Sequence, residues 1–343
     1  MKAVESDPLW DNNIAAASAV IHVPKRRPAL EPDEVAQPPT KATRLDWTVL
    51  YAESPLGLVW NSLNYSCAYD SLFTVLYNIW IGDPNAWSRR FGDVSSHMGL
   101  LSNGFEQVRQ GSLSLEAARD VVRADLRWLA PSDFPDGPNS TCIAALSSKM
   151  MNHSCRQVCG ASFWCCSRCG YKGEVVKTFA EWLQLTRTGA FQDDTSPESS
   201  VSECLAWNLV DGLEVGPFLC PQCPSLPDAT RLMSLTVSAI RLPYIMCVVF
   251  ASRRFKINGS LRYLRDQTDA TFCLRGIVYG DGSHFVARII DEDGRVWFHD
   301  GIATGSVCIP DGFLNAQSDS EWLRTSTRSH VTRSAVLAVY VRN

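Results

Sequence analysis

The sequence predicts an α+β fold in which a helical lobe precedes an antiparallel β-sheet. Residues 67–150 carry apolar positions at helical spacing, whereas the chain from Leu232 onward consists of short apolar or alternating runs rich in β-branched and aromatic residues. Between these parts lies a cysteine-rich segment with two Cys-x-x-Cys pairs. The order of helices, cysteines and strands therefore predicts two structural layers with a metal-binding insertion between them.

Composition limits the classes of function. The chain has 343 residues, of which 45% are hydrophobic and 20% charged, enough to bury a large core. The net charge of −4 and the lack of a long basic run disfavour a nucleic-acid-binding surface on electrostatic grounds. No apolar run reaches the length of a membrane span, and the N-terminus lacks a signal-peptide pattern.

The N-terminal residues 1–45 are predicted to form a disordered, Pro-rich tail. The tail contains the basic triplet Lys25-Arg26-Arg27, which is either part of a nuclear address or only solvated charge. The thirteen cysteines are distributed in a way that suits a reducing compartment with a metal site better than a disulfide framework. We therefore expect an intracellular protein of the nucleus or cytoplasm.

The first predicted helix begins at Cys67. A polar, turn-prone run of Asn and Ser ends there, and apolar residues follow at helical spacing. These residues are Leu72, Leu76, Ile79 and Trp80. At a loop-to-helix junction, unpaired backbone N–H groups and the helix dipole favour a thiolate. Cys67 is therefore a candidate nucleophile, the alternative being a small buried thiol.

A second helix is predicted over residues 114–130. Ser114 can cap its N-terminus, and Pro131 follows its end. Its predicted buried stripe comprises Leu115, Ala118, Val122, Leu126 and Leu129.

The two Cys-x-x-Cys pairs predict a structural zinc site. Cys166 and Cys169 form one pair, and Cys220 and Cys223 form the other. Four sulfurs from two such turns make a closed tetrahedral site, which leaves no position for a catalytic water. Two alternatives stay open at this stage. Cys165 can replace Cys166, or a second ion can bind a set formed by His153, Cys155, Cys159 and Cys204.

Six strands are predicted in the C-terminal part. They span residues 235–240, 244–251, 271–279, 284–291, 296–299 and 335–341. Turns are supplied by Asp281-Gly282 and by residues 291–294.

One predicted hairpin brings His284 and Asp300 together. His284 opens a strand after a glycine turn, and the returning strand ends at Asp300. The start of one strand in a tight hairpin lies opposite the end of its partner. A cysteine protease needs an imidazole that takes the thiol proton and a carboxylate or amide that orients the imidazole. Each residue alone has a structural explanation, but together with Cys67 they indicate catalysis.

Six segments, in the same order, resemble the ubiquitin-specific protease family of papain-like deubiquitinases over roughly residues 55–343. Asn64-Tyr-Ser-Cys67-Ala-Tyr-Asp-Ser71 is similar to the family's Gly-Asn-Thr-Cys-Tyr-x-Asn-Ser, and the Cys-x-x-Cys pairs match its zinc-binding fingers. Residues 242–255 resemble its Leu-Pro…Leu-Lys-Arg-Phe segment. Gly282-Ser-His284-Phe-Val-Ala and Trp297-Phe-His-Asp300 resemble Gly-His-Tyr-x-Ala and Trp-Tyr-x-Phe-Asp, and residues 336–342 resemble the closing strand.

The resemblance implies a papain-like cysteine protease fold with a helical thumb at 46–150, zinc-binding fingers at 151–230 and an antiparallel β palm at 231–343. It implies Cys67 as the nucleophile, His284 as general base and acid, and Asp300 as the orienting residue. The substrate class it implies is ubiquitin or a ubiquitin-like modifier, cleaved after its C-terminal Gly-Gly.

The chain also departs from the family pattern. The leading Gly-Leu-x-Asn is missing, and Asp70 stands where Asn is usual, a form closer to the divergent branch that acts on SUMO. The family places its oxyanion-stabilising Asn five positions before the cysteine, where this chain has Ser62. Asn61 and Asn64 flank that position, and of the two we favour Asn64.

Ubiquitin is the first expected partner and SUMO the second, with no membrane partner and a monomeric enzyme. Two other classes of function remain. One is a non-catalytic scaffold that keeps the protease fold and binds modifiers. The other is a zinc-dependent nucleic-acid-binding protein, which the acidic balance and the lack of a basic, aromatic-studded face disfavour.

Overall fold

The structure is a computed structural model, and it describes thirteen stretches of the chain. These are residues 54–151, 160–166, 168–173, 176–178, 182–185, 199–202, 219–224, 233–239, 242–250, 255–265, 268–314, 320–328 and 331–343. All of them belong to one structural unit, Trp47–Asn343. The predicted tail at 1–45 and the alternative metal set around His153 and Cys204 lie outside the described residues.

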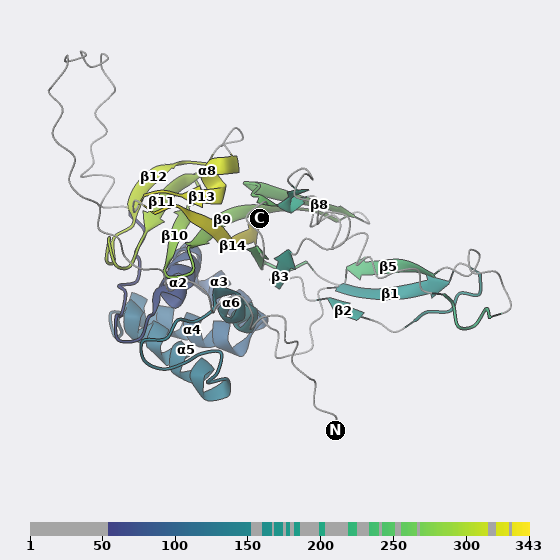
Figure 1. Cartoon of the computed structure of the whole chain (residues 1–343), viewed down its shortest axis with the longest axis horizontal. Coiled ribbons are helices and arrows are strands. Elements are labelled where there is room, and N and C mark those ends of the chain that lie inside the picture. Colours follow the sequence, from purple (N-terminus) through teal and green to yellow (C-terminus); the bar gives the residue numbers. More distant parts are fainter. Residues whose placement is uncertain are drawn as a thin grey trace, which may run out of the picture. The chain divides into compact units, whose positions relative to one another are not determined.

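Five helices within residues 54–151 form the predicted helical lobe (Figure 1). They are α2 (Cys67–Trp80), α3 (Pro84–Val94), α4 (Ser96–Arg109), α5 (Leu115–Leu129) and α6 (Ile143–Met151). Capping residues explain where two of them begin. The Asp83 carboxylate accepts a hydrogen bond from Ala86 N at 3.0 Å at the start of α3, and Ser114 Oγ accepts one from Ala117 N at 3.1 Å at the start of α5.

The predicted stripe of α5 is buried except at its end. Leu115, Ala118, Val122 and Leu126 are at most 4% exposed, whereas Leu129 is 47% exposed. Leu129 lies on the predicted face, but it is the last residue of α5 and little of the fold covers it.

Nine of the described strands form the large sheet. Its main order is β12-β11-β10-β9-β14-β6-β3, with β13 paired to β14 and β8 to β9. These strands are β3 (Trp182–Leu185), β6 (Ile245–Phe250), β8 (Ser260–Arg265), β9 (Thr268–Gly280), β10 (Phe285–Ile290), β11 (Arg295–His299), β12 (Ile309–Phe313), β13 (Thr325–Ser326) and β14 (Arg333–Arg342).

The sheet differs from the prediction in two respects. β3 pairs with β6 in parallel, so the sheet is not purely antiparallel. The predicted strand at 235–240 is β5 (Met233–Ala239), and it pairs with β1 (Gly160–Cys166) in a separate sheet that also contains β2 (Val176–Thr178). Both differences depend on which strand, far away in the chain, pairs with β3 or with β5. The periodicity of side chains within one strand does not identify its pairing partner.

Three short elements complete the described structure. β4 (Ser199–Ser200) pairs in parallel with β7 (Phe255–Lys256), and the short helix α8 (Ser320–Arg324) precedes β13. None of the described helices is long and apolar enough to cross a membrane.

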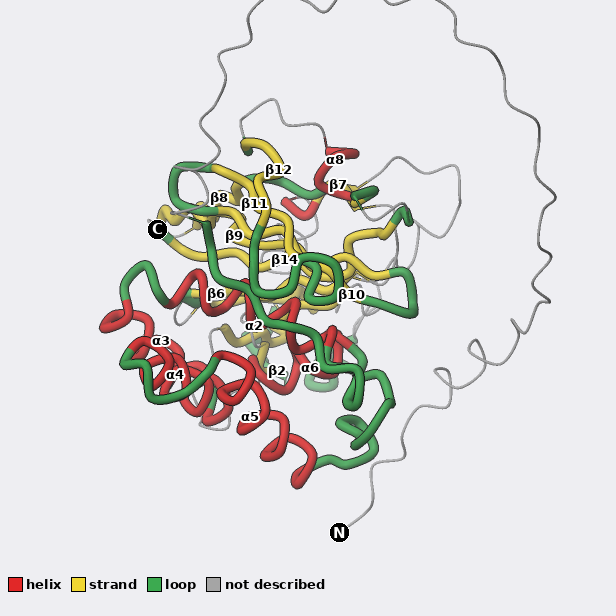
Figure 2. Tube along the Cα trace, turned by 90° about the vertical axis from the view of Figure 1, so that its left-hand side faces the viewer, coloured by secondary structure: helices red, strands yellow, loops and turns green. Residues whose placement is uncertain are grey.

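Helices α2 to α6 gather on one face of the large sheet, as the tube view in Figure 2 shows, and α2 packs against β9 and β10. Strand β10 shows why both faces are buried. Ala287 and Ile289 join the core shared with the helices, whereas Val286 and Ile290 join a second core on the opposite face. The sheet is therefore a central layer with an apolar core on each side.

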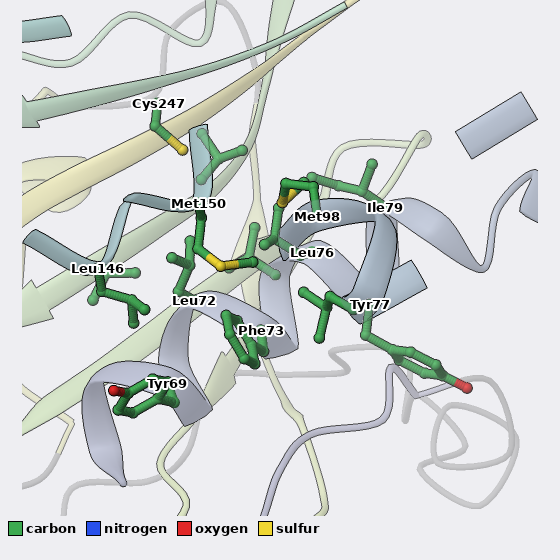
Figure 3. Close-up of a cluster of buried hydrophobic side chains, with 14 of the residues drawn as sticks. Tyr69, Leu72, Phe73, Leu76, Tyr77, Ile79, Met98, Leu146, Met150 and Cys247 are labelled. Atoms are coloured by element: carbon green, nitrogen blue, oxygen red, sulfur yellow. The ribbon is translucent and has the colours of Figure 1, made fainter. Parts of the chain in front are cut away.

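Helix α2 is central to the first core. Figure 3 shows its side chains Leu72, Phe73 and Leu76 packed together with residues of the other helices and with Cys247 of β6. Gly276 of β9 allows this close packing, since a Cβ there would lie 2.4 Å from a methyl carbon of Val75. This contact holds the middle of α2, the helix that begins at Cys67, close against β9.

Candidate active site and metal centre

Cys67 is the first residue of α2, as predicted, and it is 5% exposed. The residue before it, Ser66, occupies the N-cap position but makes no capping hydrogen bond with its side chain. The first backbone N–H groups of α2 therefore surround the cysteine without a competing cap. Such N–H groups at the start of a helix carry a partial positive charge.

His284 and Asp300 lie side by side, with His284 Nε2 at 2.9 Å from Asp300 Oδ1. The β10–β11 pairing explains this, since its register, Ala287 with His299, places Asp300 just past the strand pair at the end where His284 stands. Nε2 is engaged with the carboxylate, which leaves Nδ1 as the ring nitrogen that can interact with the nearby Cys67 thiol. The structure thus brings the three predicted residues together around one imidazole.

The electrostatics of the three groups are coupled. Burial alone would lower the pKa of His284, but hydrogen bonds to Asp300 and Cys67 and the charges of both raise it to about 9. Burial works to raise the pKa of Asp300, yet the bond to His284 and its charge lower it overall. The arrangement therefore favours an imidazolium held beside the Asp300 carboxylate.

Two turns fix the histidine and the aspartate. Asp281 Oδ1 accepts hydrogen bonds from the backbone N–H groups of Ser283 and His284 at 2.8 and 2.9 Å. Asp281 also pairs with Arg333 at 3.0 Å. Beyond β11, Asp300 Oδ1 accepts the N–H of Ile302 at 3.0 Å, so the carboxylate is oriented by its own turn as well as by the imidazole.

The segment before the nucleophile is tied to the turn that carries Asp300. Trp60 N donates to Gly301 O at 3.2 Å, and Gly57 N donates to Ser306 O at 2.9 Å. Gly57 is required at its position, because a Cβ there would lie 2.2 Å from a ring carbon of His299. The chain that leads to Cys67 and the turn after Asp300 are therefore held as one unit.

The two candidate oxyanion residues differ in their contacts. Asn61 uses its side-chain oxygen to accept Leu63 N at 3.0 Å, which leaves its NH₂ group as the free end for donation. Asn64 donates its backbone N–H to Asn61 O at 3.3 Å. An oxyanion needs donors, and a hydrogen bond within the segment sets the orientation of the Asn61 side-chain amide.

Sequence reasoning missed the buried residues behind this segment. Asp70 Oδ1 is 2.7 Å from Arg119 Nη1, and the two side chains are 2% and 1% exposed. Asp70 was noted only as a departure from the family pattern, and Arg119 was not singled out. A charged residue within a helix normally lies at the surface, and no local pattern distinguishes Arg119 from its neighbours.

The four predicted metal ligands come together. The sulfurs of Cys166, Cys169, Cys220 and Cys223 all lie within 4.8 Å of one another, and all of these residues except Cys169 are buried. Cys165 is not part of this cluster, and its sulfur instead lies 3.9 Å from the carbonyl oxygen of Cys166. Of the two alternatives for this position, the structure selects Cys166.

The cluster fits a structural zinc ion. A tetrahedral Zn–S₄ centre with bonds of about 2.3 Å places its sulfurs about 3.8 Å apart, and Cys169 Sγ lies 3.5 Å from Cys220 Sγ. Backbone N–H groups of Cys169 and Arg168 point at the Cys166 sulfur and lower its pKa to about 7. Zinc bound to these thiolates would cross-link the two turns and leave no open coordination position.

Comparisons with known proteins give a distant likeness. No protein-family model and no curated protein matches the sequence. The chain resembles solved structures of the SAGA deubiquitinating module that contains Ubp8, Sgf11, Sus1 and Sgf73. A yeast structure of this module is 15% identical with a TM-score of 0.48, over 84% of this chain and 68% of the other. A form bound to monoubiquitin is 12% identical with a TM-score of 0.44, over 84% and 69%.

Proposed function

We propose that this protein is a papain-like cysteine isopeptidase that cleaves after the C-terminal Gly-Gly of ubiquitin or of a ubiquitin-like modifier such as SUMO. The observation that carries the proposal is the position of the His284 imidazole. It lies 2.9 Å from the Asp300 carboxylate and also interacts with Cys67, at the N-terminus of a buried helix. The substrate class comes from the six sequence segments that resemble those of the ubiquitin-specific proteases and follow one another in the same order.

The geometry supports a two-step mechanism. The Cys67 thiolate attacks the carbonyl carbon of the modifier's last glycine, and an oxyanion forms on the carbonyl oxygen. His284 then donates its Nδ1 proton to the departing lysine amine, which breaks the C–N bond and leaves a thioester on Cys67. Next, His284 takes a proton from water, and the resulting hydroxide releases the modifier with a free carboxylate. Asp300 holds the imidazole in orientation throughout.

The oxyanion is stabilised by the Cys67 backbone N–H and by an amide side chain from the preceding segment. Asn61 and Asn64 are the two candidates, and the hydrogen bond that orients the Asn61 amide supports Asn61. Alanine substitution of the true donor lowers kcat by about 100-fold or more, whereas substitution of the other has a small effect. A loss confined to Asn64→Ala would restore the choice made from the sequence.

Turnover of fluorogenic substrates tests the proposal. Ubiquitin and SUMO, each with a C-terminal aminomethylcoumarin, are incubated with wild type and with Cys67→Ala. Release of fluorophore by wild type only, from one of the two, supports the isopeptidase and names the modifier. Binding of a modifier without turnover would contradict the proposal and favour the scaffold. We place such an enzyme inside the cell, in keeping with its many thiols.

A further inference from the structure

A buried ion pair lies behind the segment that leads to the nucleophile. Arg119 of α5 contacts Asp70 of α2 at 2.7 Å, and the same Nη1 atom donates to Val59 O at 3.0 Å. Arg119 Nε donates to Asp120 Oδ1 at 2.8 Å, so the guanidinium is held from two directions. One end of residues 59–66 is thereby attached to Arg119.

A short relay attaches the rest of the segment. Ser66 Oγ donates to Asp70 Oδ2 at 2.6 Å and accepts the N–H of Asn61 at 2.8 Å. A hydroxyl can donate only one hydrogen bond, and Ser66 donates it to Asp70. A lone pair of the Ser66 oxygen must therefore face the backbone N–H of Asn61. The relay therefore has a fixed direction, from the backbone N–H of Asn61 through the Ser66 hydroxyl to the Asp70–Arg119 pair.

Two properties indicate that the relay does more than fill the core. Tyr65 has a φ of +41°, an unfavourable conformation for a non-glycine residue that the surroundings must enforce. Burial also raises the pKa of Asp70 to about 7, against the opposing effects of Arg119 and Ser66, so keeping a charge at this position is costly. Apolar side chains could fill the same volume at least as stably, but they could not orient a backbone amide.

We propose that Asp70 and Arg119 are positioning residues for catalysis: through Ser66 they fix the backbone of residues 59–66, and with it the donors that stabilise the oxyanion. The inference rests on the proposed function. It also explains why an aspartate at position 70 is useful, since a carboxylate can accept from Ser66 and from Arg119 at the same time.

The first test measures the segment without any substrate. In Ser66→Ala the relay is cut while the buried volume hardly changes. Hydrogen exchange of the Asn61 backbone N–H, followed by mass spectrometry, should be at least about 10-fold faster than in wild type. The matched control is Ser147→Ala in α6, another fully buried serine, whose hydroxyl donates to Ala144 O at 3.1 Å. Unchanged exchange in Ser66→Ala would overturn the proposal.

The second test measures catalysis on ubiquitin and SUMO aminomethylcoumarin substrates. In Ser66→Ala we expect kcat to fall about 10- to 100-fold, because misplacement of catalytic donors by about 1 Å has effects of that size. KM and the rate of Cys67 alkylation by iodoacetamide should stay within about two-fold, since the thiol itself is not moved. Asp70→Asn keeps one acceptor oxygen for Ser66 and should retain more kcat than Asp70→Ala.

The two tests distinguish failure of the positioning proposal from failure of the proposed function. Faster exchange with unchanged kcat would show that the segment's position does not matter for turnover, which overturns the proposal. Equal losses of kcat in Ser66→Ala and Ser147→Ala would assign the effect to general stability and would also overturn it. If wild type turns over neither substrate, the proposed function fails, and the exchange result alone decides whether the ion pair fixes the segment.

Discussion

Cys67 and the four clustered cysteines are the same side chain in two opposite settings. The Cys67 sulfur faces an imidazole at the start of a helix, where a proton can be passed on. In the cluster, each sulfur faces other sulfurs, and the turns that carry them are 51 residues apart along the chain between Cys169 and Cys220. The first setting suits a proton transfer between the sulfur and the imidazole, and the second suits the binding of a cation. The partner of the sulfur, rather than its burial, therefore separates the two roles.

The largest expected effect comes from Cys67→Ala. Turnover should fall by at least about 10⁴-fold, because removal of the nucleophile leaves only binding and the oxyanion donors. Zinc content and melting temperature should stay close to wild type, since among the described residues the sulfur of Cys67 interacts with His284 and is not part of the cysteine cluster. Loss of zinc in this variant would contradict the view that Cys67 and the cysteine cluster have independent roles.

Asp300→Ala should lower kcat about 100-fold, in the range of general acid–base contributions. Without the carboxylate, His284 loses the partner that orients Nε2. Asp311→Asn is the matched control, because Asp311 is a buried carboxylate paired with Arg288 at 2.6 Å in the same sheet. The control should lower thermal stability and leave kcat near wild type. Equal losses of kcat in both variants would contradict the role given to Asp300.

Cys220→Ser should remove the metal. Wild type is expected to release about one equivalent of zinc per chain when the thiols are modified, measured with a colorimetric chelator. The variant should release far less and should unfold at lower temperature. Cys165→Ser is the control and should keep its zinc, because its sulfur lies outside the cluster. Zinc loss in Cys165→Ser would mean that the ligand set is different.

The smallest expected effect is a pH dependence. His284 has a pKa raised to about 9, above its ordinary value near 6.5, so its protonated form is favoured in the folded protein. The associated stability is fully present below about pH 6.5 and is lost as the pH rises through about 9. Turnover should decline over the same alkaline range, because the imidazolium that protonates the leaving amine is lost. Asp300→Asn should move this decline to lower pH, and an unmoved profile would exclude His284 as the titrating group.

The parts of the site that are local in sequence could be predicted. The helix that begins at Cys67 follows from apolar spacing, and the hairpin from His284 to Asp300 follows from one short turn. The four metal ligands follow from two short motifs.

The contacts that pair distant residues could not be predicted. Asp70 and Arg119 are 49 residues apart on separate helices, and only the packing of α2 and α5 brings them together. The parallel pairing of β3 with β6 and the assignment of β5 to a second sheet likewise depend on tertiary contacts. Periodicity reports which face of an element is buried, but not what covers that face.

Labelling with an electrophilic modifier tests the account most directly. Ubiquitin and SUMO carrying a C-terminal electrophile are added to the zinc-loaded protein, and the modified cysteine is identified by mass spectrometry. The account predicts one adduct, on Cys67 alone among the thirteen cysteines, which disappears in Cys67→Ala. Labelling that persists in Cys67→Ala, or a folded protein that reacts with neither probe, would contradict it.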